Sequence, residues 1–555
     1  MFLTIAGKIQ GTTVRRITTA VIAITLSAQA WASDADFESL ADQFVSDLPA
    51  LSPVAATWIG DHRRDADLDQ VDDTARDKLR STLQDYQAAL EAIDRDVLSR
   101  ANQIDYELLS SDVAARLWSL DELQEWAWNP LYYVNTAGSS IYNLVARDFA
   151  PVEERLGNAA ARLEQFPRFL EQARASLVPE RVPKIHAETA VAQNLGVVSI
   201  IENMIVPEMG NLTGATRTRL EAAIEVAKDA LAEHQTWLEE ELLPRAAGDF
   251  RIGAGRFDRK LAYALDSPLG RREVVARAEA EYESVRNQMY EVSKEIYLAD
   301  HPYTAFPDSP DEAYKQVIIR AALEKAYQLL PPADGIVEVA RQQLQQATDF
   351  VIEKNLVTMP DEPVEIIIMP EFQRGVSVAY LDSPGPLDKG QSTFYAVAPL
   401  PADWTGEQVR SFLREYNLYS LQDLTIHEGV PGHYLQLALS NRYPSTLRGV
   451  LGSGPMIEGW AVYAERLMID EGYQDNDPLQ RLIMLKWYLR AVTNAIIDSA
   501  IHVDGMTRDE AMQLMIEGGF QEEREAAGKW VRAQLTSSQL STYFVGYQEW
   551  VELRK

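Results

Sequence analysis

The chain of 555 residues contains no cysteine. This absence excludes disulfide bonds, thiolate metal ligands and a cysteine nucleophile, and no lipid-anchored cysteine is expected at an export cleavage site. Basic residues are also scarce, because 52 Lys and Arg stand against 83 Asp and Glu, for a formal net charge of -31. Nucleic-acid binding requires a basic surface that neutralises phosphates. We therefore expect no nucleic-acid partner.

The first 32 residues have the pattern of a cleavable export signal. Lys8, Arg15 and Arg16 provide the positive start, the stretch ITTAVIAITLSA is apolar, and A-W-A at 30–32 fits a small-residue cleavage site. A short core helix is the alternative interpretation. No later run approaches the ~20 apolar residues of a membrane span, so no membrane anchor is expected. The pattern predicts a periplasmic or secreted protein.

The rest of the chain is dominated by helical periodicity. Apolar residues recur three and four positions apart on both sides of one short region. In that region, short β-rich runs such as PVEIIIMP and QSTFYAVAPL are separated by Gly and Pro and predict a small antiparallel sheet. The sequence therefore predicts a mainly α fold in a single domain at 33–555, with a helical lobe at 33–360, the sheet at 361–400 and a catalytic helical part at 401–555.

Histidine is rare too, yet two of the seven histidines belong to one short motif. The motif HEGVPGH is followed by a second one, EGWAVYAE. Hydrolysis of an amide by zinc requires three protein ligands, an open position for water and a carboxylate that accepts the proton of that water. The two motifs supply these residue types: His427, His433 and Glu458 as ligands, and Glu428 as the general base.

The spacing of the two histidines is unusual. Six residues turn a regular helix by about 600°, so His427 and His433 would not share a helix face. Pro431 and Gly432 stand between them and allow a backbone bulge that re-aims His433 toward His427. Two interpretations stay open at this point: a metal site formed across a bulge, or two histidines at a helix break.

The two motifs resemble the paired signature H-E-x-x-P-G-H and E-G-W-A-x-Y-x-E of the bacterial DUF885 family, a group regarded as zinc metallopeptidases. RIGAGRFDRKLAYAL and RAVTNAIIDSAIHVDGMTRDEAM match in the same order, so the likeness spans most of the chain. The resemblance implies a zincin distantly similar to thimet oligopeptidase and angiotensin-converting enzyme, with two helical lobes around a channel and a small sheet beside the metal. It also implies Zn²⁺ as the cofactor at His427, His433 and Glu458.

Further polar residues are candidates for supporting roles. Glu465 shares a helix face with the first glutamate of EGWAVYAE, and it either orients a ligand or is an ordinary solvated residue. Asp498 and His502 also share a face; either Asp498 turns His502 toward the substrate or the two form a buried polar pair. Tyr543, or otherwise Tyr547, is a candidate donor to the tetrahedral intermediate, as a late tyrosine is in the related peptidases; packing is the alternative.

The sequence thus predicts an exported zinc metallopeptidase that hydrolyses short peptides, with Glu428 as the general base. A close variant would hydrolyse another amide or an ester. An alternative of a different class is a non-catalytic periplasmic zinc- or peptide-binding protein, which would have no use for a carboxylate beside the first histidine. A serine hydrolase is not supported, because the chain has no G-x-S-x-G motif.

Overall fold

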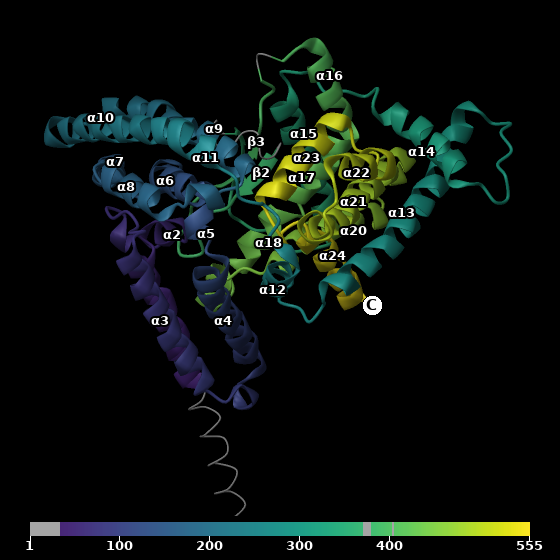
Figure 1. The fold of residues 1–555 in the computed structure, drawn as a ribbon. Coiled ribbons are helices and arrows are strands. Elements are labelled where there is room, and N and C mark those ends of the chain that lie inside the picture. Colours follow the sequence, from purple (N-terminus) through teal and green to yellow (C-terminus); the bar gives the residue numbers. More distant parts are fainter. Residues whose placement is uncertain (1–33, 370–378, 402–403) are drawn as a thin grey trace, which may run out of the picture.

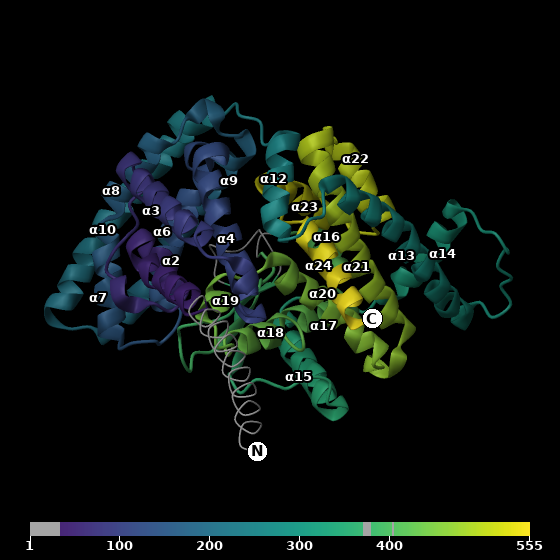
Figure 2. The ribbon, with the colours of Figure 1, turned by 90° about the horizontal axis from the view of Figure 1, so that it is seen from below.

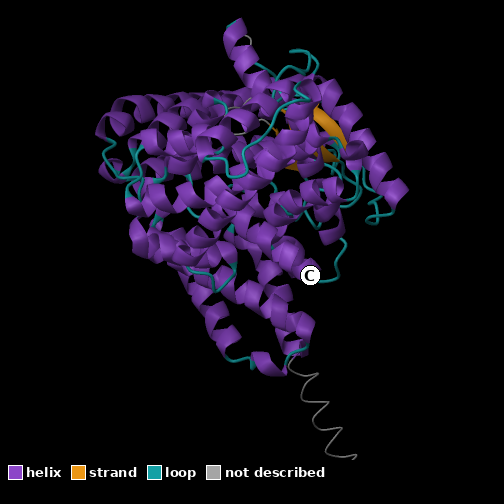
Figure 3. Cartoon of the chain, turned by 90° about the vertical axis from the view of Figure 1, so that its right-hand side faces the viewer, coloured by secondary structure: helices purple, strands orange, loops and turns teal. Residues whose placement is uncertain are grey.

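The computed structural model describes residues 34–369, 379–401 and 404–555. The predicted export signal lies outside these residues. The fold is mainly helical, as predicted, with one three-stranded sheet (Figure 3). Helices α3 to α10 gather on one side of the molecule and helices α20 to α24 on the other, and the strands lie between them (Figures 1 and 2).

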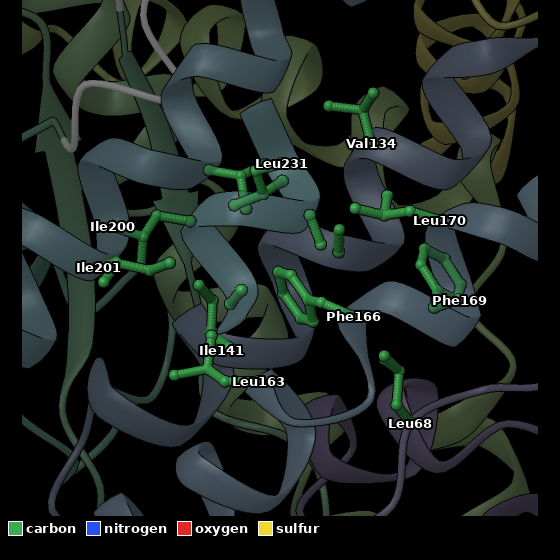
Figure 4. Packing of buried hydrophobic residues seen from close by; sticks show 14 of the residues in the cluster. Leu68, Val134, Ile141, Leu163, Phe166, Phe169, Leu170, Ile200, Ile201 and Leu231 are labelled. Carbon is green, nitrogen blue, oxygen red and sulfur yellow. The ribbon is translucent and has the colours of Figure 1, made fainter. Parts of the chain in front are cut away.

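The N-terminal body is built from helices that bury one apolar face each. Its helices are residues 34–51, α2 (Pro53–Trp58), α3 (Asp73–Glu91), α4 (Arg100–Trp118), α5 (Glu125–Trp128), α6 (Pro130–Val145), α7 (Val152–Leu163), α8 (Phe166–Ser176), α9 (Lys184–Ile200), α10 (Gly214–Trp237) and α11 (Leu243–Arg245). Figure 4 shows Ile141, Phe166 and Leu231 converging from α6, α8 and α10. All three side chains are buried, so the apolar stripes of separate helices close on one core.

One helix of this body is long and apolar enough to span a membrane, although no such segment was expected after the export signal. By length and composition, the helix Lys184–Asn211 could cross a membrane. Its Val197, Ile200 and Ile201 are buried in the N-terminal core, and 33% of its most apolar window is buried inside the protein. The packing of these three residues is that of a core helix.

The C-terminal body holds the predicted motifs. Its helices are α12 (Gly253–Leu265), α13 (Arg271–Asp300), α14 (Glu312–Ala326), α15 (Ile336–Lys354), α16 (Gly406–Glu415), α17 (Leu418–Glu428), α18 (His433–Ser440), α19 (Thr446–Val450), α20 (Gly454–Asp470), α21 (Pro478–Ser499), α22 (Arg508–Gln513), α23 (Glu523–Leu535) and α24 (Ser541–Arg554). In addition, α19 packs against the core around α3 and α4 through Leu447 and Leu451 and so joins the two bodies.

The division between the bodies lies earlier in the chain than the predicted lobe boundary at residue 360. Helices α12 to α14 share a core with α20, α21 and α24, for example through Phe257, Ile319 and Leu489. Helix α15 shares a core with α17 through Leu344 and Ile426. Helical periodicity reveals that a helix has a buried face but not which partner covers it, because the partner can lie far away in the sequence.

The small sheet is mixed, so the prediction of an antiparallel sheet is wrong for one strand pair. The strands β1 (Val364–Ile368), β2 (Ala379–Asp382) and β3 (Thr393–Val397) occur in the order β1-β3-β2. Strand β3 pairs antiparallel with β2 and parallel with β1. Strand β3 therefore lies between β1 and β2. Its apolar side chains are mostly buried, which suits this central position. The hydroxyl groups of Tyr395 in β3 and Thr425 in α17 are 3.3 Å apart, so the sheet supports the helix that carries the first histidine.

Candidate metal centre

The backbone between the two histidines is a complete helix break. Helix α17 ends at Glu428 and α18 begins at His433, so the predicted bulge within one helix is replaced by two helices with a turn between them. The amide of Gly432 donates to the carbonyl oxygen of Ile426 at 3.0 Å. A Cβ atom on Gly432 would lie 1.9 Å from the carbonyl oxygen of His427. Only glycine allows the chain to fold back this closely.

The break turns both imidazole rings toward one carboxylate from helix α20. The Nε2 atoms of His427 and His433 lie 3.8 and 3.4 Å from Oε2 of Glu458. The ring centroids are 4.7 Å apart and the ring planes meet at 88°. One ligand atom from each of the three residues lies within 4.8 Å of the others. Ligand atoms around a tetrahedral zinc ion are about 3.3 Å apart, so small side-chain adjustments would let these three hold one ion.

A second carboxylate orients the first histidine. Oε1 of Glu465 lies 2.6 Å from Nδ1 of His427, and Glu465 is 2% exposed. This contact leaves Nε2 of His427 directed toward Glu458, which is the arrangement of a carboxylate that holds a ligating histidine. Of the two interpretations of Glu465, the structure therefore excludes the solvated helix residue.

Charges within this cluster depend on one another. Burial disfavours the protonated imidazole, but hydrogen bonds with Glu458 and Glu465 outweigh it and raise the pKa of His427 well above its usual range. Burial also disfavours the carboxylate of Glu458, yet the two histidines hold its pKa well below its usual range. Asp423, one turn before His427 on α17, is fully buried next to Glu465. Burial and this neighbouring carboxylate raise the pKa of Asp423 well above its usual range.

Helices α20 and α24 cross at very short distance beside the cluster. A Cβ atom on Gly459 would lie 2.2 Å from the backbone of Gly546, and a Cβ atom on Gly546 would lie 2.1 Å from the carbonyl oxygen of Pro455. Such a crossing requires two glycines, because any side chain would separate the helices. It brings Tyr543, one turn before Gly546, close to the helix that carries Glu458.

The hydrogen bonds of Tyr543 leave its proton free. The hydroxyl oxygen accepts from Nη2 of Arg532 at 3.0 Å and from Nε2 of Gln539 at 3.3 Å. A tyrosine hydroxyl has one proton to donate, and no acceptor for it occurs among the described residues. Burial and the charge of Glu458 raise the pKa of Tyr543. By contrast, the hydroxyl of Tyr547 accepts from Arg466 and its ring packs on another tyrosine, which is a packing role.

His502 and Asp498 have separate partners. His502 lies in the π-helical turn Ala500–Asp504, and its Nε2 is 2.8 and 2.7 Å from the carbonyl oxygens of Ala533 and Thr536. Asp498 accepts hydrogen bonds from Ser541 and from the neighbouring backbone at the start of α24. Both side chains are buried, and no contact within the described residues joins His502 to the three candidate ligands. The catalytic role of His502 stays a prediction.

Comparison with known proteins assigns the chain to a family. Residues 53–555 match DUF885, described as a bacterial protein of unknown function. The chain belongs to the DUF885 family. No curated protein matches it.

Two solved structures share the fold of this DUF885 protein. One, described as a candidate lipoprotein of unknown function from Shewanella oneidensis, is 33% identical over 93% of both chains, with a TM-score of 0.76. The other, a candidate lipoprotein from Colwellia psychrerythraea, is 18% identical over 94% of this chain and 92% of that chain, with a TM-score of 0.75. At the lower identity the likeness concerns the fold alone.

Three residues near the candidate metal centre of this DUF885 protein were not predicted from the sequence. Asp423 lies four positions before His427, so a shared helix face was its only signal. Lys529 and Arg532 lie on α23, and the charge of Glu458 acts on both side chains. Their spacing is that of any amphipathic helix, so nothing local distinguished them from solvated surface residues.

Proposed function

We propose that this DUF885 protein is an exported zinc hydrolase that cleaves short peptides. One observation carries the proposal: two histidines and a glutamate from three helices converge, and a further carboxylate, Glu428, is adjacent in sequence to the first ligand. The export-signal pattern supports the location. The Shewanella relative, described as a candidate lipoprotein, supports it as well.

The donor set fits zinc. His427, His433 and Glu458 offer two imidazole nitrogens and one carboxylate oxygen, which zinc prefers, and three protein ligands leave a position open for water. Glu458 and Glu465 place carboxylate oxygens next to the imidazole rings, and this negative charge would stabilise a cation there. Zinc bound there would supply Lewis-acid activation of the substrate carbonyl and of the attacking water.

The other residues have separate tasks in the proposed reaction. Glu428, 8% exposed at the end of α17, accepts the proton of the attacking water and returns it to the leaving amine. Tyr543, which Arg532 and Gln539 hold in place, donates a hydrogen bond to the oxygen on which negative charge develops. Glu465 keeps His427 in the orientation that ligation requires.

A peptide is the substrate best supported by the surroundings of the centre. The small sheet packs on α17 through Tyr395 and Thr425, and an extended peptide can pair with the edge of such a sheet. The runner-up candidates are a hydrolase of another amide or ester and a non-catalytic binding protein. Glu428 favours catalysis, because binding a metal needs no carboxylate beside the first ligand. The channel between helical lobes stays a prediction.

Metal content and hydrolysis together test the proposal. The purified protein, Glu428→Gln and His433→Ala would be analysed by mass spectrometry after loading with zinc, and each would be incubated with a library of quenched short peptides. We expect about one zinc per chain in the wild type and in Glu428→Gln, little in His433→Ala, and cleavage by the wild type alone. Wild-type protein that takes up no zinc would refute the proposal. A wild type that binds zinc but cleaves no peptide would favour a runner-up.

A further inference from the structure

Helix α23 directs a row of charged side chains to one side. Glu525, Lys529 and Arg532 lie four and three positions apart, so they share a face of the helix. Glu525 is fully engaged, because it forms an ion pair with Arg490 at 2.5 Å and accepts a hydrogen bond from Tyr416 at 2.9 Å. No hydrogen bond or ion pair among the described residues joins this carboxylate to Lys529 or Arg532.

Lys529 is buried without a partner. It is 4% exposed, and it has no hydrogen bond or ion pair with any described residue. Burial, together with the positive charges of Arg490 and Arg532, holds the pKa of Lys529 well below its usual range, although Glu525 and Glu458 act in the opposite direction. Burial and the two guanidinium groups thus disfavour the charged form of this amine, and an anion bound beside it would stabilise that form.

Arg532 lies three positions after Lys529 on the same face of α23 and has spare donors. Its Nη2 donates to Gln539 at 3.0 Å and to Tyr543 at 3.0 Å, and both partners are neutral. Its Nε and Nη1 have no hydrogen-bond partner within the described ranges of the chain. Each of these two nitrogens can donate a charge-assisted hydrogen bond to an anion. They lie on different sides of the guanidinium group, so each would donate to a separate oxygen and the two would not form a parallel pair.

A hydrogen bond and a close helix crossing connect Arg532 to the helix that carries Glu458. The charge of Glu458 acts on Lys529, Arg532 and Tyr543 alike. Tyr543 also links Arg532 directly to α24, the helix that crosses α20 at Gly459. A group bound by the two cations would therefore lie within a few residues of the bond that the centre would hydrolyse.

We propose that Lys529 and Arg532 bind a free carboxylate of the peptide substrate next to the scissile bond. The inference rests on the proposed function and adds a substrate class to it: peptides that carry a carboxylate close to the cleaved bond. Two sources share this chemistry, namely the C-terminus of a short peptide and an acidic side chain. Arg532 would provide a directed hydrogen bond through Nε or Nη1, and Lys529 the compact charge.

Binding of three matched peptides tests this inference. The probes are N-acetyl-trialanine as the free acid, its C-terminal amide, and the same amide with glutamate at the central position. Each is titrated by calorimetry into zinc-loaded Glu428→Gln protein, which prevents turnover, and into the same protein with Lys529→Met, Arg532→Gln or Arg532→Lys added. Arg524→Gln is the matched control, because Arg524 lies on the same helix but is exposed and stacks on Trp404.

We expect a carboxylate-bearing probe to bind at least tenfold more tightly than the neutral amide. A preference for the free acid identifies the C-terminus, and a preference for the glutamate amide identifies an acidic side chain. Lys529→Met and Arg532→Gln should abolish the preference, Arg532→Lys should keep part of it, and Arg524→Gln should keep all of it. Zinc content and circular dichroism equal to those of the parent protein would show that the variants are folded.

Equal binding of all three probes, or a preference that survives both charge-removing variants, overturns the inference. Failure of the proposed function gives a different result. If the wild type cleaves peptides without regard to a carboxylate, the hydrolase stands and the subsite falls. If carboxylates bind through Lys529 and Arg532 but no peptide is cleaved, the subsite stands and the peptidase falls.

Discussion

Gly432→Ala is the sharpest test of how the chain builds the candidate metal centre. The added Cβ atom would lie 1.9 Å from the carbonyl oxygen of His427 and 2.3 Å from that of Ile426. Ordinary contacts of this kind are about 3.4 Å, so the backbone would have to open by about 1.5 Å. Zinc ligands tolerate displacements of only about 0.2 Å. Since the two flanking histidines are the candidate ligands, such an opening should separate them.

We expect zinc affinity to fall at least 100-fold, which corresponds to about 2.7 kcal/mol, and the protein itself to lose about 1–3 kcal/mol of stability through overpacking. Affinity is measured by competition with a chelator of known strength, and stability by urea denaturation of the metal-free protein. Gly157→Ala in α7 is the control, because a Cβ there meets nothing within 4 Å and helix propensity favours alanine. A Gly432→Ala protein with unchanged zinc affinity would refute the argument that this turn positions the ligands.

Three further predictions concern single side chains. Glu465→Gln should weaken zinc binding about 10- to 100-fold, measured by the same competition, whereas unchanged affinity would mean that Glu465 does not orient His427. Tyr543→Phe should lower kcat about 10²- to 10³-fold at unchanged zinc content; an unaltered kcat would remove Tyr543 from the reaction. Burial opposes protonation of His62, but hydrogen bonds with Asp388 and Asp65 raise its pKa from 6.5 to about 9. Because the folded-state pKa is the higher one, this stabilisation is complete below about pH 6.5 and is lost as the pH rises through about 9. The difference in unfolding free energy between the wild type and His62→Gln should therefore shrink by up to about 3 kcal/mol between about pH 6 and pH 9.5. Urea denaturation at each pH measures both free energies, and a difference that stays constant with pH would contradict the prediction.

The sequence by itself determined the local properties of this protein. Helical content follows from the apolar period of about 3.6 residues, and each helix needs only its own residues to display that period. The candidate ligands follow from chemistry, because only a few residue types bind zinc and because a carboxylate, Glu428, directly follows the first histidine. His427, His433 and Glu458 are therefore recognisable as candidate ligands from the sequence, and the structure brings all three together.

The turn between the histidines is only partly specified by its own residues. Pro431 and Gly432 indicated that the helix is interrupted, but not whether the interruption would join the rings or separate them. That depended on the carbonyl oxygens of Ile426 and His427, against which Gly432 packs. Contacts between backbone atoms thus decide where the turn directs the two rings, and residue types alone do not specify that direction.

Only the tertiary structure decided which distant elements meet. The parallel pairing of β1 with β3 and the union of α12 to α15 with the C-terminal helices both join segments far apart in the chain. The same holds for Lys529 and Arg532, because Glu525 on the same helix face pairs with Arg490 from α21 and with neither of them. An amphipathic pattern specifies that a face is buried, whereas its partner is selected by packing and charge across the whole molecule. For this reason the sequence identifies the candidate ligands, whereas Lys529 and Arg532 become candidates only in the fold.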